Sequence, residues 1–98
     1  MARTRVKICG MTNREEALHA AAEGVDALGF IYVAESPRYI SPFRAREIIR
    51  DLPPFVDSVG VFLNEEEGIV EDIASYCGLT AIQLHGAEPP EYCEKFSR

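Results

Sequence analysis

The strongest structural signal in the chain lies near its start, in the stretch Arg5-Val6-Lys7-Ile8-Cys9-Gly10-Met11-Thr12-Asn13. A short strand over residues 5–9 ends on a cysteine, a glycine turns the chain, and a capped helix follows at once. Reactive residues of β/α proteins lie at the carboxyl ends of parallel strands, in the loops that lead into helices. Alternation along the strand puts Lys7 and Cys9 on one face. A face with an ammonium and a thiol is unsuited to packing against helices, so we expect it to line a pocket.

The same unit of a strand followed by a helix recurs along the rest of the chain. Further strands are predicted over residues 27–33, 58–63 and 80–84. The run 27–33 is almost continuously apolar, which is typical of a parallel strand covered on both faces. Each strand is therefore expected to lie inside a layered β/α structure.

Helix start signals follow each predicted strand. Thr12 is expected to cap the first helix, and Ser41 with Pro42 supplies a cap and a proline at the first helical position. Asn64 turns the chain into a third helix, and a last helix is predicted over residues 92–96. The chain therefore alternates strictly between strands and helices.

Strict alternation implies a parallel sheet with right-handed crossovers. The unit length of about 25 residues matches a TIM (β/α)8 barrel, whose eight units take about 200 to 250 residues. Residues 1–98 are thus expected to form a single partial domain of four β/α units, the N-terminal half of a barrel. The structural competitor is an open doubly wound sheet, which normally has a fifth strand.

Composition narrows the classes of partner and compartment. The 98 residues carry a formal net charge of -6, which argues against nucleic acid and anionic membranes as partners. No apolar run is long enough to span a bilayer, and residues 1–4 are too short and polar for a signal peptide, so a cytoplasmic location is expected. The 3 cysteines fit reduced thiols, with Cys77 in a helical core position. Cysteines and histidines lack the paired spacing of a zinc site, so no metal is expected.

Several motifs together resemble one known family. These are the opening motif and four later motifs, which follow in this order: Lys7-Ile8-Cys9-Gly10-Met11-Thr12-Asn13, Asp26-Ala27-Leu28-Gly29-Phe30, Ser36-Pro37-Arg38-Tyr39-Ile40-Ser41-Pro42, Val59-Gly60-Val61-Phe62 and Gln83-Leu84-His85-Gly86. Through them the chain resembles the phosphoribosylanthranilate isomerase family. Members of that family are tryptophan-pathway enzymes with a (β/α)8 fold.

The resemblance implies an Amadori rearrangement of N-(5-phosphoribosyl)anthranilate to 1-(2-carboxyphenylamino)-1-deoxyribulose 5-phosphate, without cofactor or metal. It implies that Cys9 is the general base at ribose C2 and that Arg38 contacts the anthranilate carboxylate. The family's general-acid aspartate follows the fifth strand, and its phosphate loops follow strands seven and eight. Because these lie beyond the 98 residues, the chain alone is expected to be inactive.

Each candidate residue also has a plainer interpretation. Cysteine in a strand is often a small buried hydrophobe, and a loop arginine such as Arg38 is often only solvated, although its fork suits a carboxylate. Gln83 and His85 alternate onto one face of the fourth predicted strand, where they line the pocket or form structural hydrogen bonds. Lys7 shares the pocket face with Cys9.

Two other functions compete with the isomerase. A half-barrel leaves two edge strands and an uncovered inner face, which favours a non-catalytic assembly module that pairs with a second copy or with the missing half. A receiver-like signalling domain is disfavoured, because it needs acidic residues at strand ends, whereas Asp57 begins a strand and Cys9 ends one.

Overall fold

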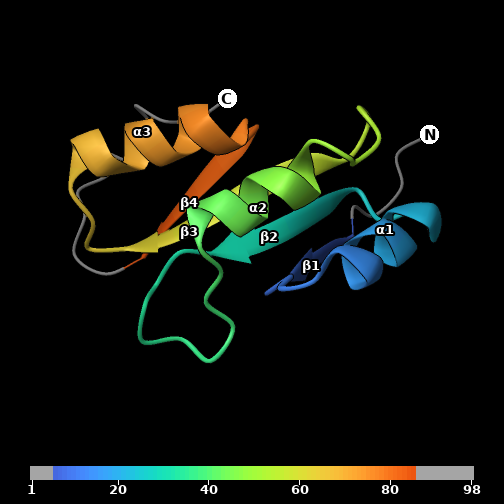
Figure 1. The fold of residues 1–98 in the computed structure, drawn as a ribbon, viewed down its shortest axis with the longest axis horizontal. Helices are drawn as coiled ribbons and strands as arrows, with labels where there is room; N and C mark the ends of the chain where they lie inside the picture. The colour runs from blue at the N-terminus through green and yellow to red at the C-terminus, as the bar shows by residue number, and fades with distance from the viewer. Residues whose placement is uncertain (1–5, 86–98) are drawn as a thin grey trace.

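The computed structural model describes residues 6–85, which form a four-stranded parallel sheet with helices between successive strands (Figure 1). The elements along the chain are β1 (Lys7–Cys9), α1 (Arg14–Ala22), β2 (Ala27–Ile31), α2 (Pro42–Ile49), β3 (Asp57–Leu63), α3 (Glu67–Cys77) and β4 (Ala81–His85). The strands lie side by side in sequence order. The helix predicted over residues 92–96 lies outside the described residues.

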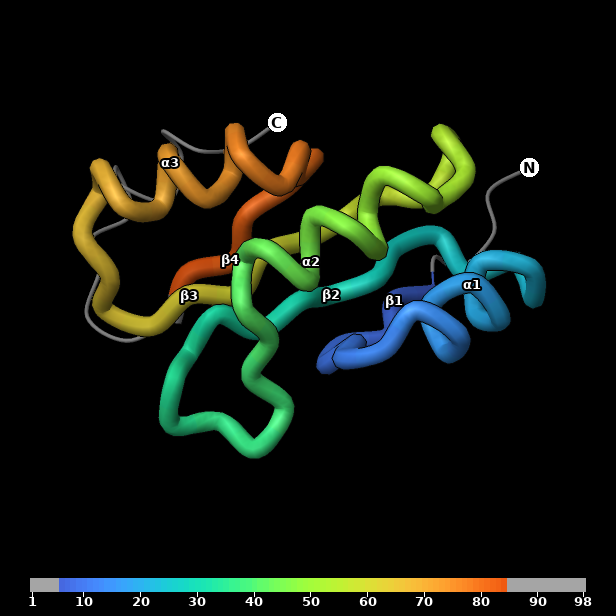
Figure 2. The backbone as a smooth tube through the Cα atoms, in the orientation of Figure 1, coloured from blue at the N-terminus to red at the C-terminus, as the bar shows by residue number. Residues whose placement is uncertain are grey.

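The helices cover one face of the sheet, as the ribbon and the tube both show (Figures 1 and 2). One core cluster joins strand residues such as Leu28 and Phe30 to all three described helices, through Ala17, Ala45 and Val70. A doubly wound sheet carries helices on both faces and reverses its strand order. Sequential order with one-sided helices instead confirms the predicted (β/α)-barrel type of fold.

The core lies between the sheet and this helical layer. Phe30, Phe62, Leu28 and Val70 are its largest fully buried side chains. The rings of Tyr32 and Phe62 stack there with their centroids 5.1 Å apart. Because side chains alternate along a strand, the neighbours of Leu28 and Phe30 face the opposite side of the sheet. We call that side, which the described helices leave uncovered, the inner face.

Side-chain caps explain where two of the helices begin. The prediction that Thr12 caps the first helix is wrong, because Asn13 is the cap: its Oδ1 accepts a hydrogen bond from the backbone N–H of Glu16 at 2.8 Å. Ser41 caps α2 as predicted, since its hydroxyl accepts from the backbone N–H of Arg44 at 3.3 Å. These caps satisfy backbone donors that have no partner within the helix.

None of the helices within residues 6–85 has the length and apolar character needed to cross a membrane. The longest of them, α3, has 11 residues and is capped by the following Gly78, which adopts a left-handed conformation with φ 74°. Glycine takes this conformation without the steric penalty that a Cβ would bring.

Candidate active site

Cys9 ends β1 with its side chain on the inner face of the sheet. The backbone register pairs Cys9 with Gly29 of β2, whose neighbours Leu28 and Phe30 point into the helical core. A Cβ atom built on Gly29 would lie 2.9 Å from the sulfur of Cys9. The thiol therefore lies directly over Gly29, half-buried and facing away from the helices.

Arg38 reaches the same strand end from the loop between β2 and α2. Its Nη1 donates a hydrogen bond to the carbonyl oxygen of Cys9 at 3.3 Å. The side chain passes over Gly10, where an added Cβ would lie 2.5 Å from Cδ of Arg38. The backbone N–H of Arg38 donates to the Ser36 hydroxyl at 3.1 Å, which helps to fix the loop. The structure thus brings the predicted pair Cys9 and Arg38 together.

Lys7 and Gln83 meet across the inner face. The ammonium of Lys7 donates a hydrogen bond to Oε1 of Gln83, which joins β1 to β4. Neighbouring strands lie about 4.8 Å apart, so β1 and β4 would be about 14 Å apart in a flat sheet. The contact therefore requires a sheet that curves toward its inner face, as a barrel wall does.

The other polar residue predicted on this strand is His85. It is the last residue of β4, and its register partner is Leu63 of β3. The side chain of His85 lies outside the part that the structure describes, so its place in a pocket stays a prediction.

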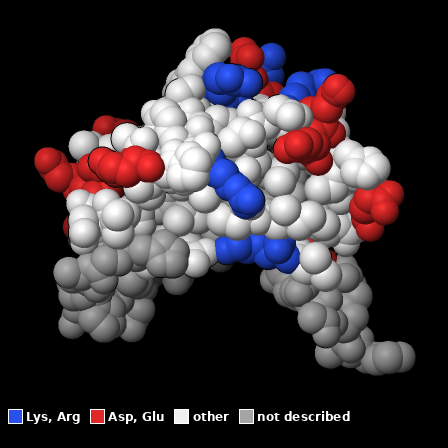
Figure 3. Space-filling model, turned by 90° about the horizontal axis from the view of Figure 1, so that it is seen from below, with Lys and Arg blue, Asp and Glu red and all other residues white. Residues whose placement is uncertain are grey.

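The charge on the molecular surface is not uniform. The space-filling view shows Lys and Arg side chains both in the middle of the visible face and along its upper edge, with Asp and Glu mostly toward its margins (Figure 3). A local concentration of positive charge favours anions even on a protein whose net charge is negative. Among residues 6–85, no group of three or more His, Cys, Asp or Glu side chains is placed to hold a metal ion.

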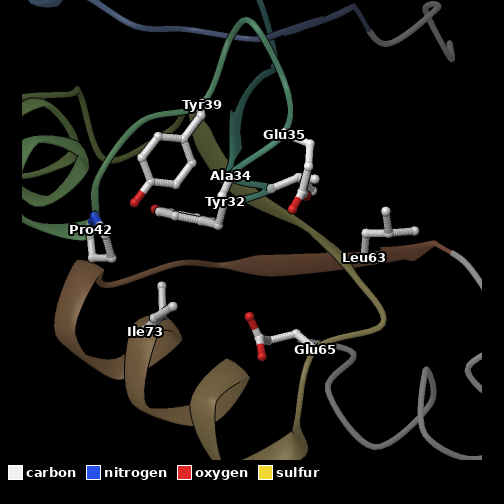
Figure 4. Close-up of a pocket in the computed structure, with 9 residues that line it drawn as sticks. Tyr32, Ala34, Glu35, Tyr39, Pro42, Leu63, Glu65 and Ile73 are labelled. Carbon is white, nitrogen blue, oxygen red and sulfur yellow. The ribbon is translucent and has the colours of Figure 1, made fainter.

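A separate cavity of about 340 Å³ opens beyond the carboxyl ends of β2 and β3 (Figure 4). The carboxylates of Glu35 and Glu65 enter it from two different loops. Neither Cys9 nor Arg38 lines it. Two carboxylates oppose the binding of an anion, so the surface around Arg38 is better suited to an anionic ligand than this cavity is.

Tyr32 and Cys77 form a buried polar contact on the helical side. The Tyr32 hydroxyl donates to the sulfur of Cys77 at 3.3 Å, and that sulfur lies 3.4 Å from the carbonyl oxygen of Pro42. Burial raises the pKa of the Tyr32 hydroxyl well above its usual range, and it also raises the pKa of the Cys77 thiol. Cys77 is 4% exposed, which confirms its predicted core position.

Sequence reasoning missed Gly29 as part of the site. The motif that contains it was recognised, but its contact with Cys9 depends on the register between β1 and β2. A glycine in the middle of an otherwise apolar strand is the one available signal, because such a glycine often marks close approach of other atoms.

Comparisons with known proteins identify the family and the fold. A family model for N-(5'phosphoribosyl)anthranilate (PRA) isomerase matches residues 6–98. The N-(5'-phosphoribosyl)anthranilate isomerase of Thermotoga neapolitana is 55% identical over 93 residues, which are 95% of this chain and 45% of that protein. The chain thus spans about half the length of the curated relatives that it matches.

Solved structures show the same relationship. A crystal structure of phosphoribosyl anthranilate isomerase in complex with reduced 1-(o-carboxyphenylamino)-1-deoxyribulose 5-phosphate matches with a TM-score of 0.92 and 56% identity, over 95% of this chain and 48% of that one. Monomers generated from the dimeric Thermotoga maritima isomerase match with a TM-score of 0.89 and 53% identity, over 95% and 47% of the two chains. Since the family model covers nearly all of the sequence and the fold agrees, the chain belongs to the N-(5'-phosphoribosyl)anthranilate isomerase family.

Proposed function

We propose that the chain supplies the Cys9 side of a phosphoribosylanthranilate isomerase of tryptophan biosynthesis. The enzyme converts N-(5-phosphoribosyl)anthranilate to 1-(2-carboxyphenylamino)-1-deoxyribulose 5-phosphate. The contact between Arg38 and Cys9 carries this proposal, because it places a potential base and a carboxylate-binding group at one strand end. A related isomerase binds the reduced form of the product, which supports a substrate of this class.

The chemistry divides between proton transfer and anion binding. Protonation of the ribose ring oxygen opens the ring and leaves a cationic imine at C1. The thiolate of Cys9 then takes the proton from C2, the C–H electrons form the C1–C2 double bond, and the imine electrons return to nitrogen. The thiolate is the basic form of cysteine. Cys9 lies on the inner face, where a barrel enzyme binds its substrate at the carboxyl ends of the strands.

Arg38 provides the anion-binding part of this arrangement. A guanidinium has five N–H donors in a planar fork that matches a carboxylate. The hydrogen bond to Cys9 uses Nη1, and the remaining donors suit the anthranilate carboxylate. Lys7, Gln83 and His85 are assigned to the lining of the substrate pocket. The reaction requires no metal or cofactor.

The 98 residues contain neither the family's general-acid aspartate nor its phosphate loops. We therefore infer that the chain by itself has negligible isomerase activity. Activity should appear when the chain is fused to the segment of the Thermotoga neapolitana isomerase that the match does not cover. Normal turnover by residues 1–98 alone would contradict this division of the site.

The fused enzyme also tests the role of Cys9. Removal of a general base costs about 10²–10⁴-fold in rate, so Cys9→Ala should lower kcat by about that factor while the far-UV circular dichroism spectrum is unchanged. His19→Ala is the matched control, since His19 is exposed on α1, and it should keep wild-type turnover. Near-normal turnover of the Cys9→Ala enzyme would refute the proposed function.

One observation favours the competing assembly function. The described sheet ends at β1 and β4, so it has two edge strands that another chain could extend. A half-barrel that only assembles would bind a partner without binding substrate. If the chain assembled stably and no assembled form bound the substrate, this alternative would be favoured over the isomerase.

A further inference from the structure

We propose that Gly29 is a positioning residue for the thiol of Cys9. By lacking a side chain, Gly29 leaves open the space on the inner face that the sulfur of Cys9 occupies. The catalytic consequence of this inference rests on the proposed role of Cys9 as a base. The contact itself is a property of the structure and can be tested separately.

The spatial relationship is close at several atoms. A Cβ built on Gly29 would lie 2.9 Å from the sulfur, 3.2 Å from Cα and 3.3 Å from Cβ of Cys9. The shortest of these distances is below what real Cβ atoms show in proteins. An alanine at this position would therefore force the sulfur or the strand to move.

Neither strand can move easily to relieve such a contact. The carbonyl oxygen of Gly29 accepts hydrogen bonds from the backbone N–H groups of Gly10 and Met11, both at 3.0 Å. On the other side of Gly29, the fully buried Leu28 and Phe30 hold β2 in the helical core. The easiest response is rotation of the Cys9 side chain, which carries the sulfur away from its place over Gly29.

The backbone conformation does not explain why this residue is glycine. Gly29 lies inside a regular parallel strand and lacks the positive φ angle found at Gly10, which is 94°. Glycine weakens a strand because it has no side chain to pack. Among the described contacts, the close approach of Cys9 is what accounts for a glycine here.

Sulfur position matters if Cys9 removes a proton from carbon. Catalysis by a positioned group depends on near-attack geometry, and a displacement of about 1 Å can cost about 100-fold in rate. Gly29 touches the catalytic group but has no side chain that could reach the substrate. Its contribution is therefore to the orientation of the thiol.

A thermal double-mutant cycle tests the contact in residues 1–98. Overpacking at this site should lower the Tm of Gly29→Ala by on the order of 10 °C. In the Cys9→Ala background the 2.9 Å contact with the sulfur is gone, whereas the 3.2 Å and 3.3 Å contacts with Cα and Cβ of residue 9 remain. The same substitution should therefore cost less there than in the wild type. Equal Tm losses in both backgrounds would overturn the proposal, because the strain would then arise elsewhere.

A chemical measurement separates positioning from general destabilisation. Iodoacetamide labelling of Cys9 can be followed in the tryptic peptide of residues 8–14, at a temperature where each variant is folded. We expect Gly29→Ala to raise the labelling rate, because a displaced sulfur is more exposed. The matched control is Gly60→Ala, whose Cβ would lie 2.5 Å from Leu79 Cδ1 on the helical side. Equal labelling rates in the two variants would overturn the positioning role.

Kinetics in the fused enzyme provide the functional test. Gly29→Ala should lower kcat by about 100-fold with a smaller change in KM, whereas Gly60→Ala should keep kcat near wild type at temperatures where it is folded. An unchanged kcat in Gly29→Ala would overturn the catalytic part of the inference. If Cys9→Ala remains fully active, the proposed function fails instead, and the Tm cycle still decides whether the contact exists.

Discussion

Arg38 has observed contacts within the protein and a proposed contact with the substrate. One of its guanidinium nitrogens donates to the backbone carbonyl of Cys9, and its stem packs over Gly10. The rest of the fork is available to a carboxylate in the proposed complex. In the proposed enzyme, this one exposed side chain would both bind the substrate carboxylate and restrain the strand end that carries the thiol.

Arg38→Ala should raise KM by about 10- to 100-fold, because a hydrogen bond to a charged group contributes about 1.5–3 kcal/mol. The kcat should fall by a smaller factor, through loss of the contact with Cys9. Steady-state kinetics of the fused enzyme measures both parameters. Arg44→Ala is the control, since Arg44 is an exposed arginine on α2. An unchanged KM for Arg38→Ala would exclude the proposed carboxylate contact.

The buried Tyr32–Cys77 pair predicts a loss of stability in alkali. Both pKa values are raised in the folded state, mainly by burial, so the unfolded chain releases these protons at lower pH. Each group contributes its full stabilisation at pH values below its pKa in the unfolded chain, which is about 8.5 for cysteine and about 10 for tyrosine. This stabilisation is lost as the pH rises above that pKa. Each group can contribute a slope of at most about 1.4 kcal/mol per pH unit.

Urea unfolding between pH 8 and pH 11 should show this loss. Tyr32→Phe keeps the ring stacked on Phe62 but removes the titrating hydroxyl, so its free energy of unfolding should fall less steeply above about pH 10. Tyr39→Phe, which alters an exposed tyrosine, should follow the wild-type curve. A Tyr32→Phe curve parallel to that of the wild type would contradict the assignment.

At the scale of elements, periodicity and caps predict the strands and helices well, but they leave close choices open. Thr12 and Asn13 can both cap a helix, and the backbone of the turn decides between them: Asn13 has extended φ and ψ angles of -138° and 152°. At Ser41 the following proline removes that ambiguity. The proline after Ser41 therefore marks the helix start correctly, whereas the capping-box pattern of Thr12 and Glu15 does not.

The face taken by each residue of β2 is harder to predict. Its first four residues are all buried, so the hydrophobic pattern does not alternate along the strand. The pattern therefore does not show which face each residue takes. Only the packing of Leu28 and Phe30 against the helices shows that Gly29 faces Cys9. The family motifs name Cys9 and Arg38 as candidates, whereas the contact with Gly29 depends on pairing between distant segments.

The cap of α1 offers a test with an adjacent control. Asn13→Ala should lower the free energy of unfolding by about 1 kcal/mol, because the Glu16 amide loses its partner. Thr12→Ala, which alters the neighbouring residue, should have a clearly smaller effect. Urea denaturation of the two variants measures the difference. Equal losses, or a larger loss for Thr12→Ala, would show that the cap lies one residue earlier in solution.

At the scale of the whole molecule, the curved sheet has a covered and an uncovered side. The helices bury one face, whereas the contact between Lys7 and Gln83 spans the other. At the amino-terminal end of the strands, the inner face carries a cavity of about 270 Å³ lined in part by Ala27, Val59 and Ala81. Lys7, Asp26 and Asp57 also line this cavity. The two edge strands of the described sheet, rather than the cavity, therefore favour association with another chain.

We expect residues 1–98 alone to sediment with a concentration-dependent coefficient that reports self-association. An equimolar amount of the segment of the Thermotoga neapolitana isomerase that the match does not cover should convert these species into a one-to-one complex. That complex completes the sheet and should bury at least about 1,000 Å². Isomerase activity should rise in proportion to the complex.

A charge on the inner face provides the matched comparison. Ala81→Glu places a carboxylate beside the cavity on that face, so it should weaken the complex and lower activity together, since burial of an unpaired charge is unfavourable. Ala22→Glu places the same charge on the exposed surface of α1 and should alter neither. If the Ala81→Glu chain assembled as tightly as the wild type, the complex would form through another surface. A chain that stayed monomeric at every concentration, alone and in the mixture, would show that the sheet edges and inner face do not drive assembly.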